Sequence, residues 1–288
     1  MNRWRCSLAL SVTLLMFWIS APFPAAQSQQ RHTGSRLILF EEEKINPALE
    51  FEYERGVTGL AEAIRTSKAN KEWSWESSSR HGTYYYVWPL RSVEVLDDKS
   101  EQAQHRQKML WDEVGQATYE KWATIYRPAV RTTKTYVLER LDDLSYQPAS
   151  SAVHDPKFVF IDIHRVRNNR LPQYKAVIAR FVEAVRKSGY PIGWTAYRSI
   201  IGEARMYCYF SPLDSQSQFY EKFPFPTALE KSLGKDGAEQ LEKDIRDCME
   251  TYEYFDARLR PEMSNLGHLG KAQSSEGGNR PQSLGTMY

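Results

Sequence analysis

The pattern Tyr-x-x-x-Arg-Leu occurs twice in the chain, in Tyr136-Val137-Leu138-Glu139-Arg140-Leu141 and in Tyr254-Phe255-Asp256-Ala257-Arg258-Leu259, 118 positions apart (254 − 136). Two further echoes have nearly the same offset: Pro89-Leu90 and Pro212-Leu213 lie 123 apart (212 − 89), and Trp75 and Trp194 lie 119 apart (194 − 75). Similarity at a fixed period indicates a repeated structural unit. The three echoes, which come in the same order, therefore predict a duplicated domain.

The first 28 residues have the composition of a secretory signal peptide. Arg3 and Arg5 give a positive start, an apolar run covers 6–21, and Ala26-Gln27-Ser28 fits a small-x-small cleavage site. The alternative is an uncleaved membrane anchor, but the run is shorter than the roughly 20 residues that span a bilayer. We therefore expect residues 1–28 to be removed. The mature protein is expected to be exported, periplasmic or secreted, with no stable membrane anchor.

The composition narrows the class of partner. The formal net charge is +2, so no strongly basic surface for nucleic acid is expected. Aromatic residues make up 13% of the chain, with 17 Tyr and 8 Trp, and rings that carry a polar atom suit a partly wet cavity. No Gly-x-Gly-x-x-Gly, P-loop or Gly-x-Ser-x-Gly motif occurs. This absence disfavours nucleotide-dependent enzymes and α/β-hydrolases.

Each half of the chain has the hydrophobic periodicity of a strand, a helix, two strands, a helix and a strand. In the first half we expect strands at 37–43, 73–77, 83–88 and 132–141, with helices from Pro47 and over 101–126. In the second half we expect strands at 157–166, 194–200, 204–210 and 251–259, with helices from Pro172 to Gly189 and over 238–248. These elements give a first repeat at 36–141, a linker at 142–156 and a second repeat at 157–262. The polar composition of 263–288 predicts a disordered tail.

A βαββαβ unit is the ferredoxin-like arrangement, in which two helices cover one face of a four-stranded sheet and the other face stays bare. Two such units can bury their bare faces against each other. In its element order and its three echoes the chain resembles the dimeric α/β-barrel superfamily, in a single-chain tandem arrangement. The resemblance implies an α+β fold whose two sheets form one intramolecular barrel. We expect a monomer, because each repeat then satisfies the sheet of the other.

Period-two alternation predicts which side chains point into the barrel. Met206, Cys208 and Phe210 suit packing beneath helices, which leaves the alternate tyrosines of that strand for the interior. The same reasoning, with the repeat offset, predicts one set of interior aromatic residues: Trp73, Trp75, Tyr84, Tyr86, Trp88, Tyr136, Tyr207, Tyr209 and Tyr254. Two interpretations stay open. The rings line a pocket for a flat or apolar ligand, or they fill the space between the sheets.

His164 and Asp162 are the candidate catalytic residues. They lie on the same face of one predicted strand, roughly 6.5–7 Å apart, with Glu41 and Glu43 as their expected counterparts. A histidine titrates near neutral pH and suits general-base catalysis. The alternative is a polar residue satisfied by its neighbours. No His-x-His, His-Glu-x-x-His or Cys-x-x-Cys motif occurs, so no dedicated metal site is expected.

Two cysteines, Cys208 and Cys248, remain after removal of the leader. Exported proteins meet an oxidising environment. Cys208 is placed on the helix side of its sheet, and Cys248 on the apolar side of the helix that covers this sheet. A structural disulfide between them is predicted, and the alternative is two buried free thiols that act as small apolar groups.

Three functions are compatible with this sequence. The first is an exported protein that binds a small aromatic or apolar molecule in the barrel. The second is an oxygenase or haem-dependent enzyme, as the resemblance implies, with His164 as base or axial ligand; haem is compatible with this reading, although no motif indicates it. The third is a packed barrel that serves in protein interaction. The sequence identifies neither ligand nor cofactor, and a likeness of fold alone does not choose between functions.

Overall fold

The computed structural model describes residues 35–218 and 225–267. In the first repeat the elements are β1 (Leu37–Ile45), α1 (Glu50–Arg65), β2 (Glu76–Arg80), β3 (Thr83–Leu90), α2 (Glu101–Glu113), α3 (Gln116–Tyr126) and β4 (Val130–Tyr146). In the second repeat they are β5 (Phe158–Val166), α4 (Leu171–Ser188), β6 (Trp194–Ile201), β7 (Met206–Leu213), α5 (Phe225–Cys248) and β8 (Met249–Leu259). The predicted signal peptide lies outside the described residues. Within the described ranges, no helix has the length and apolar character needed to cross a membrane.

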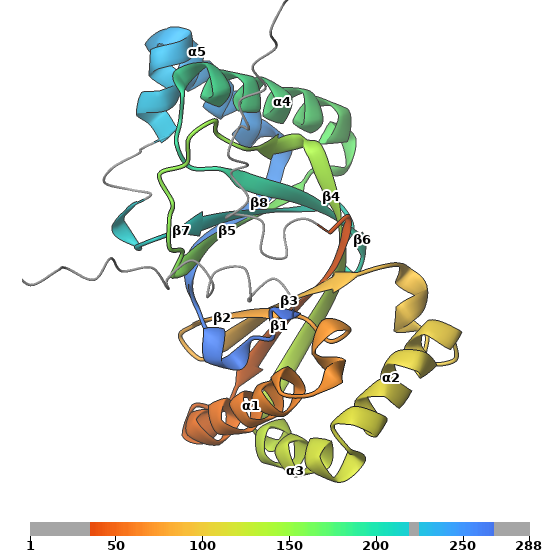
Figure 1. Ribbon diagram of the computed structural model, residues 1–288. Coiled ribbons are helices and arrows are strands. Elements are labelled where there is room, and N and C mark those ends of the chain that lie inside the picture. Colours follow the sequence, from red (N-terminus) through yellow and green to blue (C-terminus); the bar gives the residue numbers. More distant parts are fainter. Residues whose placement is uncertain (1–34, 219–224, 268–288) are drawn as a thin grey trace, which may run out of the picture.

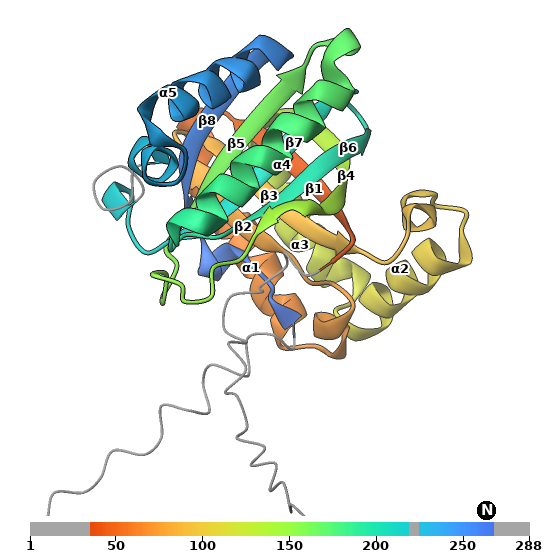
Figure 2. The same ribbon diagram turned by 90° about the horizontal axis from the view of Figure 1, so that it is seen from above.

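The eight strands form one closed barrel in the order β1-β3-β2-β8-β5-β7-β6-β4. Helices α1 and α3 cover one side of the barrel, and α4 and α5 cover the opposite side (Figure 1). Seen from above, α4 runs across β5 and β7 of its own repeat (Figure 2). The predicted α+β fold, with two ferredoxin-like repeats facing each other in one chain, is confirmed.

The single long helix predicted over 101–126 is two helices in the structure. The break lies at Gly115, whose φ of 84° is in the left-handed region that glycine adopts without strain. After the break α3 packs on α1, where the two backbones approach closely: a Cβ added to Gly59 would come within 2.5 Å of the Trp122 ring. The break therefore lets α3 cover the sheet while α2 extends to the side (Figure 1).

The two seams that join the repeats differ in length. Strand β4 pairs with β6 over 137–141 and, after an irregularity, again at Tyr146, so the first residues of the predicted linker continue a strand. Strands β2 and β8 share two registered pairs, Ser78 with Leu259 and Ser79 with Arg258. The barrel is therefore asymmetric, with one long and one short seam.

Residues 261–265, which we call the closing segment, extend the short seam. Trp75 and Asn265 exchange two backbone hydrogen bonds, of 2.7 and 2.9 Å, and Arg65 donates to the Ser264 carbonyl at 2.7 Å. Met263 is buried. The prediction that the chain is disordered from residue 263 is therefore wrong at its start, because 263–267 pack on the first repeat. The rest of the predicted tail lies outside the described residues.

Both faces of the barrel sheet are buried. One apolar cluster occupies the interior and takes side chains from both repeats. A second lies between the sheet of the second repeat and helices α4 and α5, and a third lies between the first sheet and its helices. The face to which a strand residue points therefore decides which of three separate spaces it enters.

Candidate functional site

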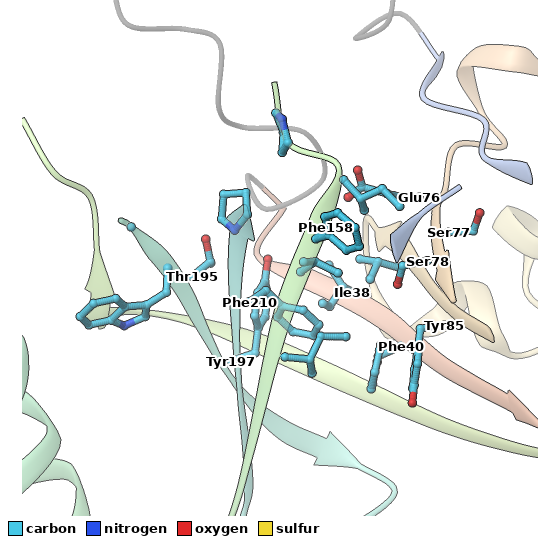
Figure 3. Close-up of a pocket in the computed structure, with 18 of the residues that line it drawn as sticks. Ile38, Phe40, Glu76, Ser77, Ser78, Tyr85, Phe158, Thr195, Tyr197 and Phe210 are labelled. Carbon is cyan, nitrogen blue, oxygen red and sulfur yellow. The ribbon is translucent and has the colours of Figure 1, made fainter. Parts of the chain in front are cut away.

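The barrel interior is filled by side chains over most of its length. Phe40 of β1 meets Phe210 of β7 with ring centroids 5.5 Å apart, and Tyr85 of β3 stacks on Phe255 of β8 at 5.0 Å. These ring contacts pass through the barrel interior, since β1 is not a neighbour of β7 in the sheet, nor β3 of β8. Figure 3 shows the remaining space beside Phe40 and Ser78, a cavity of about 70 Å³. That is about half the 150 Å³ of an engineered cavity that admits benzene.

The predicted faces of β3 and β7 are inverted in the structure. Met206, Cys208 and Phe210 belong to the interior cluster, whereas Tyr207 and Tyr209 lie beneath α4 and α5. The prediction assumed a wet interior that would suit hydroxyl-bearing rings. A barrel of eight strands is instead narrow enough to be filled by side chains. The gap between sheet and helices takes whole tyrosine rings and supplies partners for their hydroxyls.

The other residues of the predicted interior set also lie mostly outside the barrel. Five of them pack between the first sheet and its helices: Trp73, Trp75, Tyr84, Tyr86 and Trp88. Trp73 lies beside α2, where its Nε1 donates to the Arg106 carbonyl at 3.2 Å. Tyr136 is in the interior, as predicted. Tyr254 is on the outer face and is 51% exposed.

The echo that indicated the repeat is one residue out of structural register. Glu41 pairs with Thr135, and the equivalent Asp162 pairs with Tyr254. Thr135, rather than Tyr136, therefore corresponds to Tyr254. A shift of one residue moves a strand side chain to the opposite face of the sheet, which is why the two echoed tyrosines point in opposite directions.

A larger cavity, which we call the outer cavity, lies between strands β5, β7 and β8 and helices α4 and α5. Its volume is about 500 Å³, within the range of roughly 300–1,000 Å³ that is usual for small-molecule sites. The walls are largely apolar and aromatic, and include Phe160, Ile178, Phe181, Trp194, Phe225 and Ile245. Polar groups come from Asp162, His164 and Ser211 and from the ion pair of Glu242 with Arg246, and the half-exposed rings of Tyr252 and Tyr254 lie at the rim.

Four side chains form a buried polar chain at the wall of the outer cavity. His164 Nδ1 lies 2.6 Å from the hydroxyl of Tyr174, which lies 2.7 Å from the hydroxyl of Tyr209. His164 Nε2 lies 3.1 Å from Asp162 Oδ1. The two atoms form no hydrogen bond, so the contact is electrostatic. Asp162 Oδ1 is buried and has no hydrogen-bond partner in the part of the chain that the structure describes. The polar chain therefore ends at Asp162 Oδ1, an acceptor that can still take a hydrogen bond.

The protonation of the chain follows from burial and from the carboxylate. Burial raises the pKa of Tyr174 and of Tyr209 well above the ordinary value of a phenol, so both are neutral and each has one proton to donate. The carboxylate of Asp162 favours the tautomer of His164 that carries its proton on Nε2. Nδ1 then accepts from Tyr174, and Tyr174 accepts from Tyr209. This assignment rests on the hydrogen-bond network.

Three elements, β5, α4 and β7, position these groups. Asp162 and His164 lie two residues apart on β5, so both side chains point to the outer face. Tyr174 lies in the first turns of α4 and is fully buried against this face. The periodicity of α4 predicted a buried Tyr174 but not its role. The signal that was available is the offset: Tyr53 and Tyr174 are 121 apart (174 − 53), as are Glu43 and His164 (164 − 43).

The first repeat contains a counterpart of the polar chain. The Tyr53 hydroxyl donates to Glu43 Oε2 at 2.5 Å and lies 2.5 Å from the Tyr86 hydroxyl. Burial raises the pKa of Glu43, and burial together with the nearby Glu43 raises that of Glu41. The predicted correspondence of Glu41 and Glu43 with Asp162 and His164 agrees with the strand pairing.

The predicted disulfide between Cys208 and Cys248 is absent, and both cysteines are buried free thiols. Cys208 faces the barrel interior, while Cys248 packs in the cluster beneath α4 and α5. The sheet separates the two sulfur atoms. The inverted face of β7 therefore accounts for this error as well.

The site does not fit a haem iron bound by His164. Both ring nitrogens already have polar neighbours, Tyr174 at 2.6 Å and Asp162 at 3.1 Å, and an iron on Nε2 would have to displace the carboxylate. The described residues contain no cluster of three or more His, Cys, Asp or Glu side chains that could hold a metal ion.

Comparison with known proteins gives a likeness of fold. No family model matches the chain, and no curated protein matches it significantly. A chlorite dismutase variant from Candidatus Nitrospira defluvii is 8% identical with a TM-score of 0.49, over 82% of this chain and 96% of that one. The imidazole complex of that enzyme is 11% identical with a TM-score of 0.47, over 82% and 96%. An anthrone oxidase-like protein is 9% identical with a TM-score of 0.45, over 79% and 93%. At these values the activities of those proteins are not carried over.

Proposed function

We propose that this is an exported protein that binds a small, largely aromatic or apolar molecule in the outer cavity of its second repeat. The observation that carries the proposal is a buried oxygen of Asp162, Oδ1, which lies at the wall of a cavity of about 500 Å³ and accepts no hydrogen bond from any described residue. An unsatisfied buried acceptor costs about 1–3 kcal/mol. A ligand that donates a hydrogen bond removes this cost. Export rests on the composition of residues 1–28.

The walls indicate the chemistry of the ligand. Rings of Phe181 and Trp194, with centroids 5.8 Å apart, offer contact to a flat apolar body. The polar end of the ligand is a hydroxyl or amine, because Asp162 Oδ1 accepts no hydrogen bond from the described residues. The half-exposed Tyr254 lies at the rim, where it can cover the bound molecule.

An acid–base enzyme acting on the same molecule is the second candidate. It is favoured by the contact of His164 with both Asp162 and Tyr174. In the tautomer that carries its proton on Nδ1, with the Tyr174 oxygen as acceptor, His164 can take a proton from a substrate at Nε2, and Asp162 stabilises the imidazolium that forms. The two candidates differ in one variant: His164→Ala abolishes turnover by an enzyme but leaves most of the affinity of a binding protein.

The test is the binding of a fluorescent probe, anilinonaphthalene sulfonate, together with native mass spectrometry of the purified protein. Ser211→Trp places an indole in the outer cavity, and we expect it to abolish probe binding and any retained mass. The matched control is Val159→Phe, which fills the small cavity in the barrel interior. Loss of binding in the control, with Ser211→Trp unaffected, would overturn the proposal.

A further inference from the structure

Tyr174 has the surroundings of a phenol that can lose a proton and an electron together. Its side chain is 0% exposed, and its hydroxyl lies 2.6 Å from Nδ1 of the His164 imidazole. Transfer of the phenolic proton to Nδ1 makes His164 an imidazolium, with Asp162 Oδ1 3.1 Å from Nε2. The carboxylate therefore stabilises the charge that the transfer creates.

The second neighbour of Tyr174 acts in the same direction. The Tyr209 hydroxyl lies 2.7 Å from that of Tyr174 and donates to it in the tautomer assigned above. After oxidation this hydrogen bond remains, so the Tyr174 oxygen keeps a donor when its own proton has moved. A buried oxygen without any partner would be costly.

A series of aromatic rings connects Tyr174 to the protein surface. The exposed rings of Tyr252 and Tyr254 have centroids 5.2 Å apart, and Tyr252 lies 5.1 Å from the His164 ring. His164 in turn lies 5.8 Å from the Tyr174 ring. An electron acceptor at the rim of the outer cavity is therefore separated from Tyr174 by rings in contact.

We propose that Tyr174 is a one-electron redox site. An outer-sphere one-electron oxidant at the rim accepts the electron and is reduced by one. The O–H bond of Tyr174 breaks, its proton forms an N–H bond at Nδ1 of His164, and a neutral phenoxyl radical remains. Return of one electron and of the same proton restores the phenol. This inference goes beyond the proposed function and does not depend on the bound ligand.

The first repeat provides an internal control. Tyr53 is also 0% exposed, and its ring lies 4.6 Å from that of Tyr84, as the Tyr174 ring lies 4.7 Å from that of Tyr207. Its proton acceptor, however, is the carboxyl of Glu43 rather than an imidazole. Burial raises the pKa of Glu43, so this acceptor is protonated over a wider pH range.

The experiment uses the purified full chain and photogenerated tris(bipyridine)ruthenium(III), followed by electron paramagnetic resonance. Wild type is expected to give a neutral phenoxyl signal that Tyr174→Phe removes and Tyr53→Phe retains. His164→Gln is expected to slow formation of the signal by about 100-fold, the usual contribution of a positioned base. Both Phe variants keep the ring, and circular dichroism verifies that they fold.

Three results would overturn the inference. One is a signal of equal yield and shape in Tyr174→Phe and wild type, which would place the radical elsewhere. Another is equal loss in Tyr53→Phe and Tyr174→Phe. The third is an unchanged rate in His164→Gln. A protein that binds no probe yet forms the Tyr174 radical would retain this inference and remove the proposed function.

Discussion

The outer faces of the two repeats share one framework and differ in what it encloses. In each repeat, a tyrosine of the first helix lies between the opening strand and a tyrosine of another strand. The helix tyrosine is Tyr53 in the first repeat, where its hydroxyl contacts that of Tyr86, and Tyr174 in the second, where its hydroxyl contacts that of Tyr209. The tilted ring pairs are also alike, with interplanar angles of 52° in both Tyr53–Tyr84 and Tyr174–Tyr207. The shared arrangement of tyrosines therefore serves to pack the first helix of each repeat on its sheet.

The difference lies at the positions around this framework. Trp88 stacks on Trp75 at 4.8 Å in the first repeat, whereas Ser211 is opposite Trp194 in the second and lines the outer cavity. Glu43 is replaced by His164. A ring is exchanged for a hydroxyl, and a carboxyl for an imidazole. The comparison shows that the space between sheet and helices is filled by packed rings in the first repeat and forms the candidate site in the second.

The largest expected effect is the loss of stability when either framework tyrosine, Tyr53 or Tyr174, is removed, and the two losses show whether both residues contribute equally to the free energy of unfolding. Tyr53→Ala and Tyr174→Ala each remove a fully buried ring, and each is expected to lower the free energy of unfolding by about 3–5 kcal/mol. Urea denaturation of both variants measures this. A loss confined to one of them would show that the repeats do not depend on the framework in the same way.

Exchanging the residues at positions 88 and 211 tests the filled and hollow faces directly. Trp88→Ser is expected to cost about 2 kcal/mol, below the full cost of a core tryptophan because Trp88 is only partly buried. It should also create a probe-binding space in the first repeat. Fluorescence titration of Trp88→Ser in the Ser211→Trp background isolates that new space, and no binding there would mean that the first repeat collapses around the missing ring.

The buried carboxyls of the first repeat predict a pH dependence. Burial raises the pKa of Glu41 and of Glu43 above 4.5, so the folded state binds more protons than the unfolded state from pH 4.5 up to the raised values. Stability is therefore lost as pH rises through this window, by at most about 1.4 kcal/mol per pH unit for each carboxyl. Subtracting the unfolding free energies of Glu41→Gln/Glu43→Gln from those of wild type, pH by pH, isolates the effect. A flat difference would contradict it.

The smallest effect concerns the thiols. Strand pairing makes Cys208 the counterpart of Tyr85 in the barrel interior, so a small group faces the large rings there. Cys208→Ala is expected to cost about 1 kcal/mol. Denatured protein with the leader removed should react with two equivalents of a thiol reagent without prior reduction. One equivalent or none would mean that the cysteines are oxidised.

The fold was predictable because it rests on periodicity and on repetition, which the sequence displays directly. The face of each strand was not. Both faces of β7 are buried, so the alternation of Met206, Tyr207 and Cys208 contains no contrast between polar and apolar sides. The assignment then depended on whether the interior is wet, which is a property of the closed barrel. The predicted disulfide failed for the same reason.

Of the candidate site, the sequence predicted Asp162 and His164 on one strand face, and the structure places them together with Tyr209 at the outer cavity. The partner that completes the chain, Tyr174, lies ten residues from His164 on another element, and its contact requires the helix to be docked. Pattern reasoning could reach it through the repeat offset, since Tyr53 occupies the equivalent position.

The position of the short seam near the end of the chain determines when the barrel can close as the chain is synthesised. During synthesis the first repeat is complete at β4, yet its interior face, with Phe40 and Tyr85, has no partner until the second repeat follows. The barrel cannot close until β8 has been added, because β8 forms the short seam with β2. At roughly 5–20 residues per second this interval is on the order of ten seconds. For that time the nascent chain exposes an aromatic surface, so we expect it to need a chaperone more than the finished protein does.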